Sequence, residues 1–191
     1  MDKQTIGFAM CGSFCTFKDT IPQIKLLNDK GYEVIPIMSQ NAYTFNTRFG
    51  AAKDFIASIE DMCNKNIIHS IEQAEPIGPK SLLDAMIIAP CTGNSASKIS
   101  LGITDTSVTM SAKAHLRNEK PLIIAISTND ALGLSAKNIG LLHSSKNIYF
   151  VPYKQDSPQN KPSSMVAEMD KIHDTLISAM KGKQLQPMII S

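Results

Sequence analysis

The stretch that decides the fold is AMIIAPCTGNSASKISLGITD, residues 85–105. It begins with an apolar run up to Pro90, which is typical of a strand buried on both faces of a parallel sheet. Thr92, Gly93, Asn94 and Ser95 then follow almost together. Small polar residues at this point serve either as a helix cap or as ligand contacts at the end of a strand.

The same alternation of short apolar runs and amphipathic segments extends along the whole chain. It predicts strands at residues 5–11, 33–39, 83–90, 121–127 and 147–152, with a short one near 67–71. Helices are predicted from the first strand to Lys30, with Gly31 as the stop, and at 51–64, 94–101, 107–118 and 131–143. Strands alternating with helices predict an α/β fold: one domain over residues 1–191 with a doubly wound, mostly parallel sheet.

The C-terminal part of the chain has a different composition. Residues 153–164 are polar and contain proline, and they are predicted to form a long surface loop. A C-terminal helix is expected next, with Ser164 as a candidate cap. Its apolar stripe would consist of Met165, Met169, Ile172, Leu176 and Met180.

Composition excludes few functions but weighs against several. The 19 basic and 17 acidic residues give a net charge of +2 without a basic block, which argues against nucleic-acid or membrane-surface binding. No signal peptide and no apolar stretch of roughly 20 residues is present, so a cytoplasmic protein is expected. The cysteines, Cys11, Cys15, Cys63 and Cys91, form no CxxC pair, and no metal site is predicted.

Small hydroxyl and amide residues follow four of the predicted strands. In an open α/β sheet, ligands bind at the carboxyl ends of the strands, so these loops are the candidate binding site. A single loop of this kind is more often a helix cap than a ligand contact, but four at one edge of the sheet favour a site. The loops are Gly12-Ser13-Phe14, Ser39-Gln40-Asn41, Cys91-Thr92-Gly93-Asn94-Ser95 and Ser127-Thr128-Asn129-Asp130.

The chemistry of these loops suits a flavin mononucleotide. Gly12 allows close approach of the backbone, and a helix start beyond it directs N–H groups at an anion. Hydroxyl donors for a phosphate are Ser13, Ser39, Ser95 and Ser97, while Thr92, Asn94 and Asn129 suit the polar edge of a flat ring. A dinucleotide is not supported, since the chain has neither GxGxxG after its first strand nor GxxxxGK[ST].

No catalytic residue can be identified from spacing. His69 is the only histidine near a predicted strand end, and no Ser-His-Asp or Cys-His arrangement is evident. The nearest carboxylates, Asp105 and Asp130, are equally well placed to cap helices.

Residues 89–105, APCTGNSASKISLGITD, resemble the long motif of the flavin-dependent cysteine decarboxylase superfamily. Gly-Ser-Phe at 12–14 is similar to the first flavin loop of that superfamily, and AISTNDALG at 125–133 occupies the place of its PAMN segment. The resemblance implies a Rossmann-like flavoprotein fold, bound FMN and a homo-oligomer. The flavin-binding residues it implies are Gly12, Ser13, Phe14, Ser39, Pro90, Cys91, Thr92, Asn94, Ser127, Thr128 and Asn129.

Two departures from the family pattern concern the chemistry. Pro76 stands where the decarboxylases carry a catalytic histidine, and proline cannot transfer a proton. Of the PAMN segment only Asn129 is kept, with Ser127 and Thr128 before it. We therefore expect the flavin site to be retained without cysteine decarboxylation.

Two further stretches, 7–17 and 150–167, resemble one component of a two-component oxidoreductase in that superfamily, found in spore-forming bacteria. This resemblance implies a dehydrogenase-like partner chain, NAD(P) bound only by that partner, and a dicarboxylate substrate that is oxidised to an aromatic ring. Two other functions remain open: an FMN-dependent decarboxylase of a cysteine-bearing acid, and a non-catalytic partner that keeps the fold. Candidate cations for the dicarboxylate are Lys154, Lys161, Lys98 and Arg48.

Overall fold

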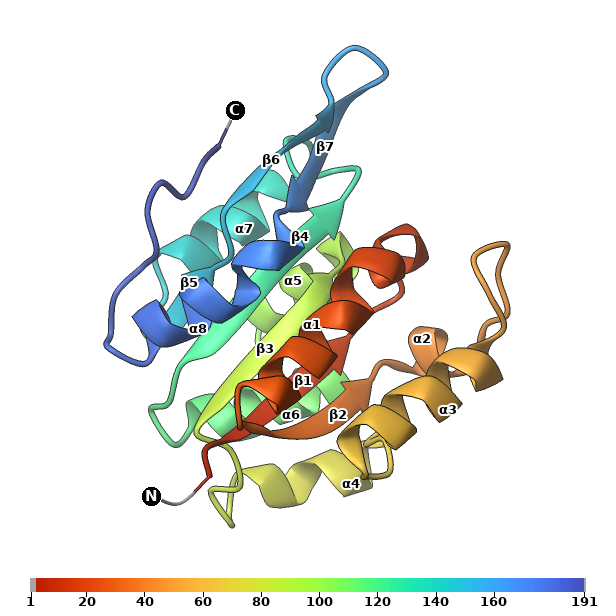
Figure 1. The fold of residues 1–191 in the computed structure, drawn as a ribbon. Helices are drawn as coiled ribbons and strands as arrows, with labels where there is room; N and C mark the ends of the chain where they lie inside the picture. The colour runs from red at the N-terminus through yellow and green to blue at the C-terminus, as the bar shows by residue number, and fades with distance from the viewer. Residues whose placement is uncertain (1–2, 191) are drawn as a thin grey trace.

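The structure is a computed structural model that describes residues 3–190. At its centre is a seven-stranded sheet, and the parallel strands follow the order β2-β1-β3-β4-β5. The predicted α/β fold with a doubly wound, mostly parallel sheet is confirmed (Figure 1). The parallel strands are β1 (Thr5–Met10), β2 (Glu33–Met38), β3 (Ala85–Cys91), β4 (Leu122–Thr128) and β5 (Ile148–Phe150).

The two remaining strands form an antiparallel hairpin, β6 (Tyr153–Ser157) and β7 (Lys161–Ala167). One edge of β4 is shared between two partners: β5 pairs with its first half, and β7 pairs with Ser127 and Thr128 at its end. The hairpin thus stands beside the carboxyl end of β4 and projects beyond the sheet (Figure 1).

The middle of the sheet is the core of the molecule. All seven residues of β3 are buried, as are the first six of β4, which explains why both segments are almost continuously apolar. β2, at the sheet's edge, has two half-buried positions in its first three residues. The central strands therefore need helices on both faces.

Helices cover the two faces of the sheet, with α1, α3 and α8 on one side and α5, α6 and α7 on the other (Figure 1). α1 ends as predicted, because Gly31 adopts a positive φ of 92° directly after the C-cap. Pro22 lies inside α1 and does not end it. The helices are α1 (Phe17–Asp29), α2 (Gln40–Thr44), α3 (Ala52–Cys63), α4 (Ile71–Ala74), α5 (Gly93–Ser100), α6 (Ser107–Leu116), α7 (Ala136–His143) and α8 (Ile172–Ala179).

The prediction of a polar loop at 153–164 is wrong, because this segment is the β6–β7 hairpin. Residues 158–160 form its turn, and they include Pro158 and Asn160, which favour turns. Met165 and Ala167 of β7 are buried. These residues belong to a strand that pairs with the end of β4, a contact that the polar composition of the segment does not predict.

Three other predicted boundaries are also corrected. The strand near 67–71 is reduced to a single bridge between Ile37 and Ile68, and α4 begins at Ile71. The helix predicted at 131–143 begins only at Ala136, after a turn. The last helix is only residues 172–179, so Ser164, a residue of β7, does not cap it.

Candidate functional site

A cavity of about 850 Å³ opens at the carboxyl ends of β1, β3 and β4. This is the point where the strand order reverses, since the chain passes from β1 to β2 on one side and to β3 on the other. Flavodoxin-like sheets of this order bind their ligand at that point. The cavity is lined by Gly12, Ser13, Phe14, Cys15, Thr16, Lys18, Asp19, Phe49, Thr92, Gly93, Asn94, Ser127, Thr128, Asn129, Asp156, Lys161, Ser164, Met165 and Val166.

Three of the four predicted loops meet in this cavity. In the lining of this cavity, the hydroxyl oxygens of Ser13 and Ser127 lie 2.8 Å apart in a hydrogen bond, which joins the end of β1 to the end of β4. Sequence separation hides this contact, since the two serines are 114 positions apart. The predicted site residues that line the cavity are Gly12, Ser13, Phe14, Thr92, Asn94, Ser127, Thr128 and Asn129.

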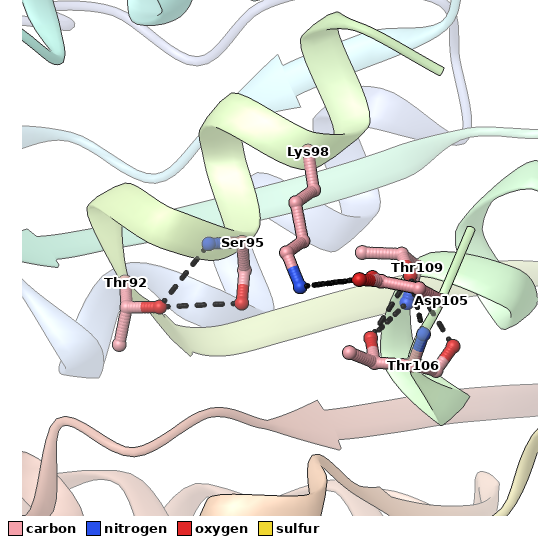
Figure 2. Close-up of polar contacts among 6 residues, drawn as sticks. All are labelled: Thr92, Ser95, Lys98, Asp105, Thr106 and Thr109. Carbon is pink, nitrogen blue, oxygen red and sulfur yellow. Dashed lines mark hydrogen bonds and ion pairs between the residues drawn. The ribbon is translucent and has the colours of Figure 1, made fainter. Parts of the chain in front are cut away.

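The loop after β3 combines a structural role with its place in the cavity wall. Thr92 is the N-cap of α5: its Oγ1 accepts a hydrogen bond from the backbone N–H of Ser95 at 3.3 Å and lies 3.2 Å from the Ser95 hydroxyl (Figure 2). Gly93 has no room for a side chain, because an added Cβ would lie 2.8 Å from Thr128 Oγ1. Asn94 is exposed and is free to contact a ligand.

The second half of the sequence motif at residues 89–105 does not line the cavity but holds two helices together. Lys98 donates to both carboxylate oxygens of Asp105 at 2.9 and 2.8 Å, and this hydrogen bond lowers the pKa of Asp105 (Figure 2). Thr106 and Thr109 form a reciprocal capping box at the start of α6. These contacts tie α5 to α6 and fix the direction in which α5 leaves the cavity.

Three of the eleven predicted flavin-binding residues do not line the cavity, and neither do the predicted phosphate donors Ser95 and Ser97. Ser39 caps α2 by accepting a hydrogen bond from the backbone N–H of Ala42 at 3.4 Å. Pro90 and Cys91 are buried in β3, so the expectation that Cys91 forms part of the wall is not supported by the geometry. Burial raises the pKa values of Cys91 and of its neighbour Cys11, and both thiols therefore stay protonated at neutral pH.

The β6–β7 hairpin supplies a wall that sequence reasoning missed. Ser164, Met165 and Val166 reach the cavity because β7 pairs with the end of β4. The sequence of β7, KPSSMVA, has no alternation of polar and apolar residues, so its first half is hard to distinguish from a loop.

Most of the cations proposed for a dicarboxylate already have partners. Lys161 pairs with Asp156 at 2.7 Å, and both line the cavity. Lys154 forms an ion pair with Glu168, and Lys98 with Asp105 as described above. A ligand would have to displace a carboxylate to use any of these three lysines.

Pro76 and the histidines lie outside the cavity lining. Pro76 is on the short 3-10 helix Glu75–Ile77, next to α6. His69 stacks on Tyr43, with ring centroids 4.0 Å apart. Within residues 3–190, no group of three or more His, Cys, Asp or Glu is placed to hold a metal ion. No helix in that same range is long and apolar enough to cross a membrane.

The residues present fit a flavin mononucleotide. The hydroxyl groups of Ser13 and Thr128 and the N-terminal end of α5 are neutral donors of the kind that hold a phosphate without positive charge. Phe14 and Met165 give the same cavity an apolar side on which a flat ring can lie. Its volume lies within the range of about 300–1,000 Å³ that is usual for small-molecule sites.

The chain is similar to several known proteins over most of its length. The chain is 48% identical over 185 residues to the B subunit of dipicolinate synthase from Bacillus subtilis (strain 168), an alignment covering 97% of this chain and 92% of the relative. The crystal structure of the corresponding dipicolinate synthase chain from Bacillus halodurans superposes with a TM-score of 0.91 at 45% identity, covering 98% and 96% of the two chains. The FMN-binding protein AtHal3 shares the fold, with a TM-score of 0.67 at 17% identity over 96% and 100% of the chains. The Flavoprotein family model matches residues 1–181, and the chain belongs to that family.

Proposed function

We propose that this chain is the FMN-binding B subunit of a dipicolinate synthase, which takes part in the oxidation of dihydrodipicolinate to dipicolinate during sporulation. The observation that carries the flavin part is the cavity at the reversal point of the sheet, where neutral donors and an apolar side stand beside two lysines and two aspartates. The assignment of this reaction is supported by the similarity of nearly the whole chain to the B subunit of dipicolinate synthase.

Within the proposal, the chain's own residues bind and orient. Ser13 and the start of α5 hold the phosphate, while Asn94 and Asn129 meet the polar edge of the ring. Gly12 and Phe14 complete the first flavin loop, and Ser127 keeps Ser13 in place through their 2.8 Å contact. A bound FMN supplies two-electron redox chemistry, which is what aromatising a dihydropyridine ring requires.

The proposal includes a partner. We propose that the A subunit, a dehydrogenase-like protein, binds NAD(P). This chain itself has no GxGxxG after β1. Activity requires both proteins, and this chain also self-associates. We place the complex in the cytoplasm of the mother cell of a sporulating bacterium. Cysteine decarboxylation is the weaker alternative, because Pro76 stands at the position of the decarboxylase histidine.

The first test is titration of the purified protein with FMN, followed by quenching of flavin fluorescence. We expect Asn94→Ala and Asn129→Ala each to weaken binding about tenfold, or roughly 1.4 kcal/mol, because both amides are exposed to the cavity. Asn66→Ala, an exposed asparagine outside the cavity, is the matched control and should leave affinity unchanged. A wild-type protein that does not bind FMN would refute the cofactor assignment.

The same preparations decide the role of the flavin. Dihydrodipicolinate oxidation should require this chain, FMN and the A subunit together. Full activity with flavin-free protein would instead support a non-catalytic partner that only keeps the fold.

A further inference from the structure

A second cavity, of about 580 Å³, adjoins the first. The two share Phe14, Cys15, Lys18 and Phe49, so a molecule in the second cavity would lie next to one in the first. The lining of the second cavity is almost entirely apolar and aromatic: Phe14, Cys15, Phe17, Lys18, Ile21, Pro22, Phe49 and Phe55.

Four phenylalanines from two segments of the chain, residues 14–17 and 49–55, form the walls. The ring centroids of Phe14 and Phe17 are 5.2 Å apart, and Phe17 contacts Phe55 edge-on at 5.1 Å. Phe49 comes from the tight turn Thr47–Gly50, whose two backbone hydrogen bonds are 3.0 and 3.1 Å long. Gly50 has a φ of 150°, and a Cβ there would lie 2.6 Å from the Phe55 ring. Only glycine lets this turn rest on Phe55 and present Phe49 to the cavity.

Two cations lie near this aromatic wall: Lys18 is in the lining of the second cavity, whereas Arg48 is outside the lining of both cavities and contacts Phe49. Lys18 is the one charged residue in the lining of the second cavity, and no carboxylate among residues 3–190 forms an ion pair with it. The Arg48 guanidinium carbon lies 4.9 Å from the centroid of the Phe49 ring. Lys161, by contrast, is neutralised by Asp156. Lys18 and Arg48 can therefore accept an anion without displacing a carboxylate.

We propose that the second cavity binds the substrate of the proposed reaction, a six-membered dihydropyridine ring carrying two carboxylates. The ring lies between phenylalanine faces, and Lys18 and Arg48 each meet a carboxylate at the rim. Such a ligand satisfies both features of the cavity, since its faces are apolar and its charges are at its edge. This inference rests on the proposed function, because the shared wall places the ring beside the bound flavin.

The test is calorimetric titration of the protein with pyridine-2,6-dicarboxylate, both with FMN bound and without it. Lys18→Ala and Arg48→Ala should each weaken dicarboxylate binding about tenfold, or roughly 1.4 kcal/mol. Because Lys18 also lines the first cavity and Arg48 does not, Arg48→Ala is the variant that should change FMN affinity less than about twofold. Lys137→Ala, an exposed lysine on α7, is the matched control and should bind like the wild type. Pyridine-2-carboxylate, which has one carboxylate, should bind the wild type more weakly than the dicarboxylate does. In Lys18→Ala and in Arg48→Ala, the difference in affinity between the two ligands should be smaller than in the wild type.

The outcomes separate the two proposals. Equal dicarboxylate affinity in the wild type and both variants would overturn the inference, as would a wild type that binds no dicarboxylate with or without FMN. A protein that fails to bind FMN overturns the proposed function instead. In that case, dicarboxylate binding that depends on Lys18 in the flavin-free protein still supports the second cavity as the ring site.

Discussion

His115 is a fully buried histidine on α6 whose surroundings favour its neutral form. Its Nε2 lies 2.9 Å from the carbonyl oxygen of Pro121, which can only accept, so Nε2 carries the hydrogen. Nδ1 is buried without a hydrogen-bond partner among residues 3–190, and a second proton there would have no acceptor. Burial lowers the pKa of His115 accordingly.

This lowered pKa makes folding sensitive to acid. The unfolded chain binds a proton at about pH 6.5 and the folded chain only at lower pH, so the free energy of unfolding is highest above pH 6.5 and falls below it. Burial lowers the pKa of His143 too, with the same sign. We expect urea denaturation to show a clear loss of stability between about pH 7.5 and 5.5, at most about 1.4 kcal/mol per pH unit per histidine. His115→Gln should reduce that loss, and an unchanged pH dependence in this variant would contradict the assignment.

Strand β5 has one edge paired with β4 and the other closed by a single side chain. Gln184 accepts from the backbone N–H of Phe150 at 2.8 Å and donates to the Phe150 carbonyl at 2.7 Å. Because Phe150 is fully buried, its backbone groups rely on this side chain and not on water for these two hydrogen bonds. Gln184 thus makes the two hydrogen bonds with the Phe150 backbone that a neighbouring strand would otherwise make.

Removing this side chain should destabilise the fold measurably. Gln184→Ala leaves two buried backbone groups unpaired, and we expect the free energy of unfolding to fall by about 2 kcal/mol. Gln184→Glu can still accept from the N–H but not donate to the carbonyl, so it too should be less stable than the wild type. Gln40→Ala, at an exposed site, serves as the control and should stay within about 0.5 kcal/mol. Wild-type stability in Gln184→Ala would show that the edge of β5 needs no such closure.

The elements that the sequence predicts correctly are those with strong local signals. β3 and β4 are apolar throughout, and Gly31 marks the end of α1, so periodicity and a single glycine suffice. The β6–β7 hairpin was missed because its burial comes from pairing with β4, a contact between residues far apart in the sequence. The same holds for the candidate site. The sequence predicts the loops at the strand ends, but it does not predict Phe49 and Lys18, which reach the cavity only through tertiary packing.

A ligand in the first cavity would contact loops that lie far apart in the sequence, around Gly12, Gly93 and Thr128, together with the β6–β7 hairpin. Because these loops end three adjacent strands of one sheet, FMN should stabilise the whole fold and not a single segment. By mass action, FMN at about 100 times its dissociation constant adds about 2.7 kcal/mol, which raises the melting temperature of a domain of this size by about 5–10 °C.

Thermal melts followed by circular dichroism test this with two ligands. Riboflavin, which lacks the phosphate, should give a smaller shift than FMN at the same concentration. The difference arises because Ser13 and the start of α5 would then have no anion to bind. Equal shifts would mean that the ring alone provides the binding energy and that the polar end of the cavity does not hold a phosphate. An unchanged melting temperature with both ligands would exclude flavin from this cavity, because a ligand that binds only the native state must stabilise it.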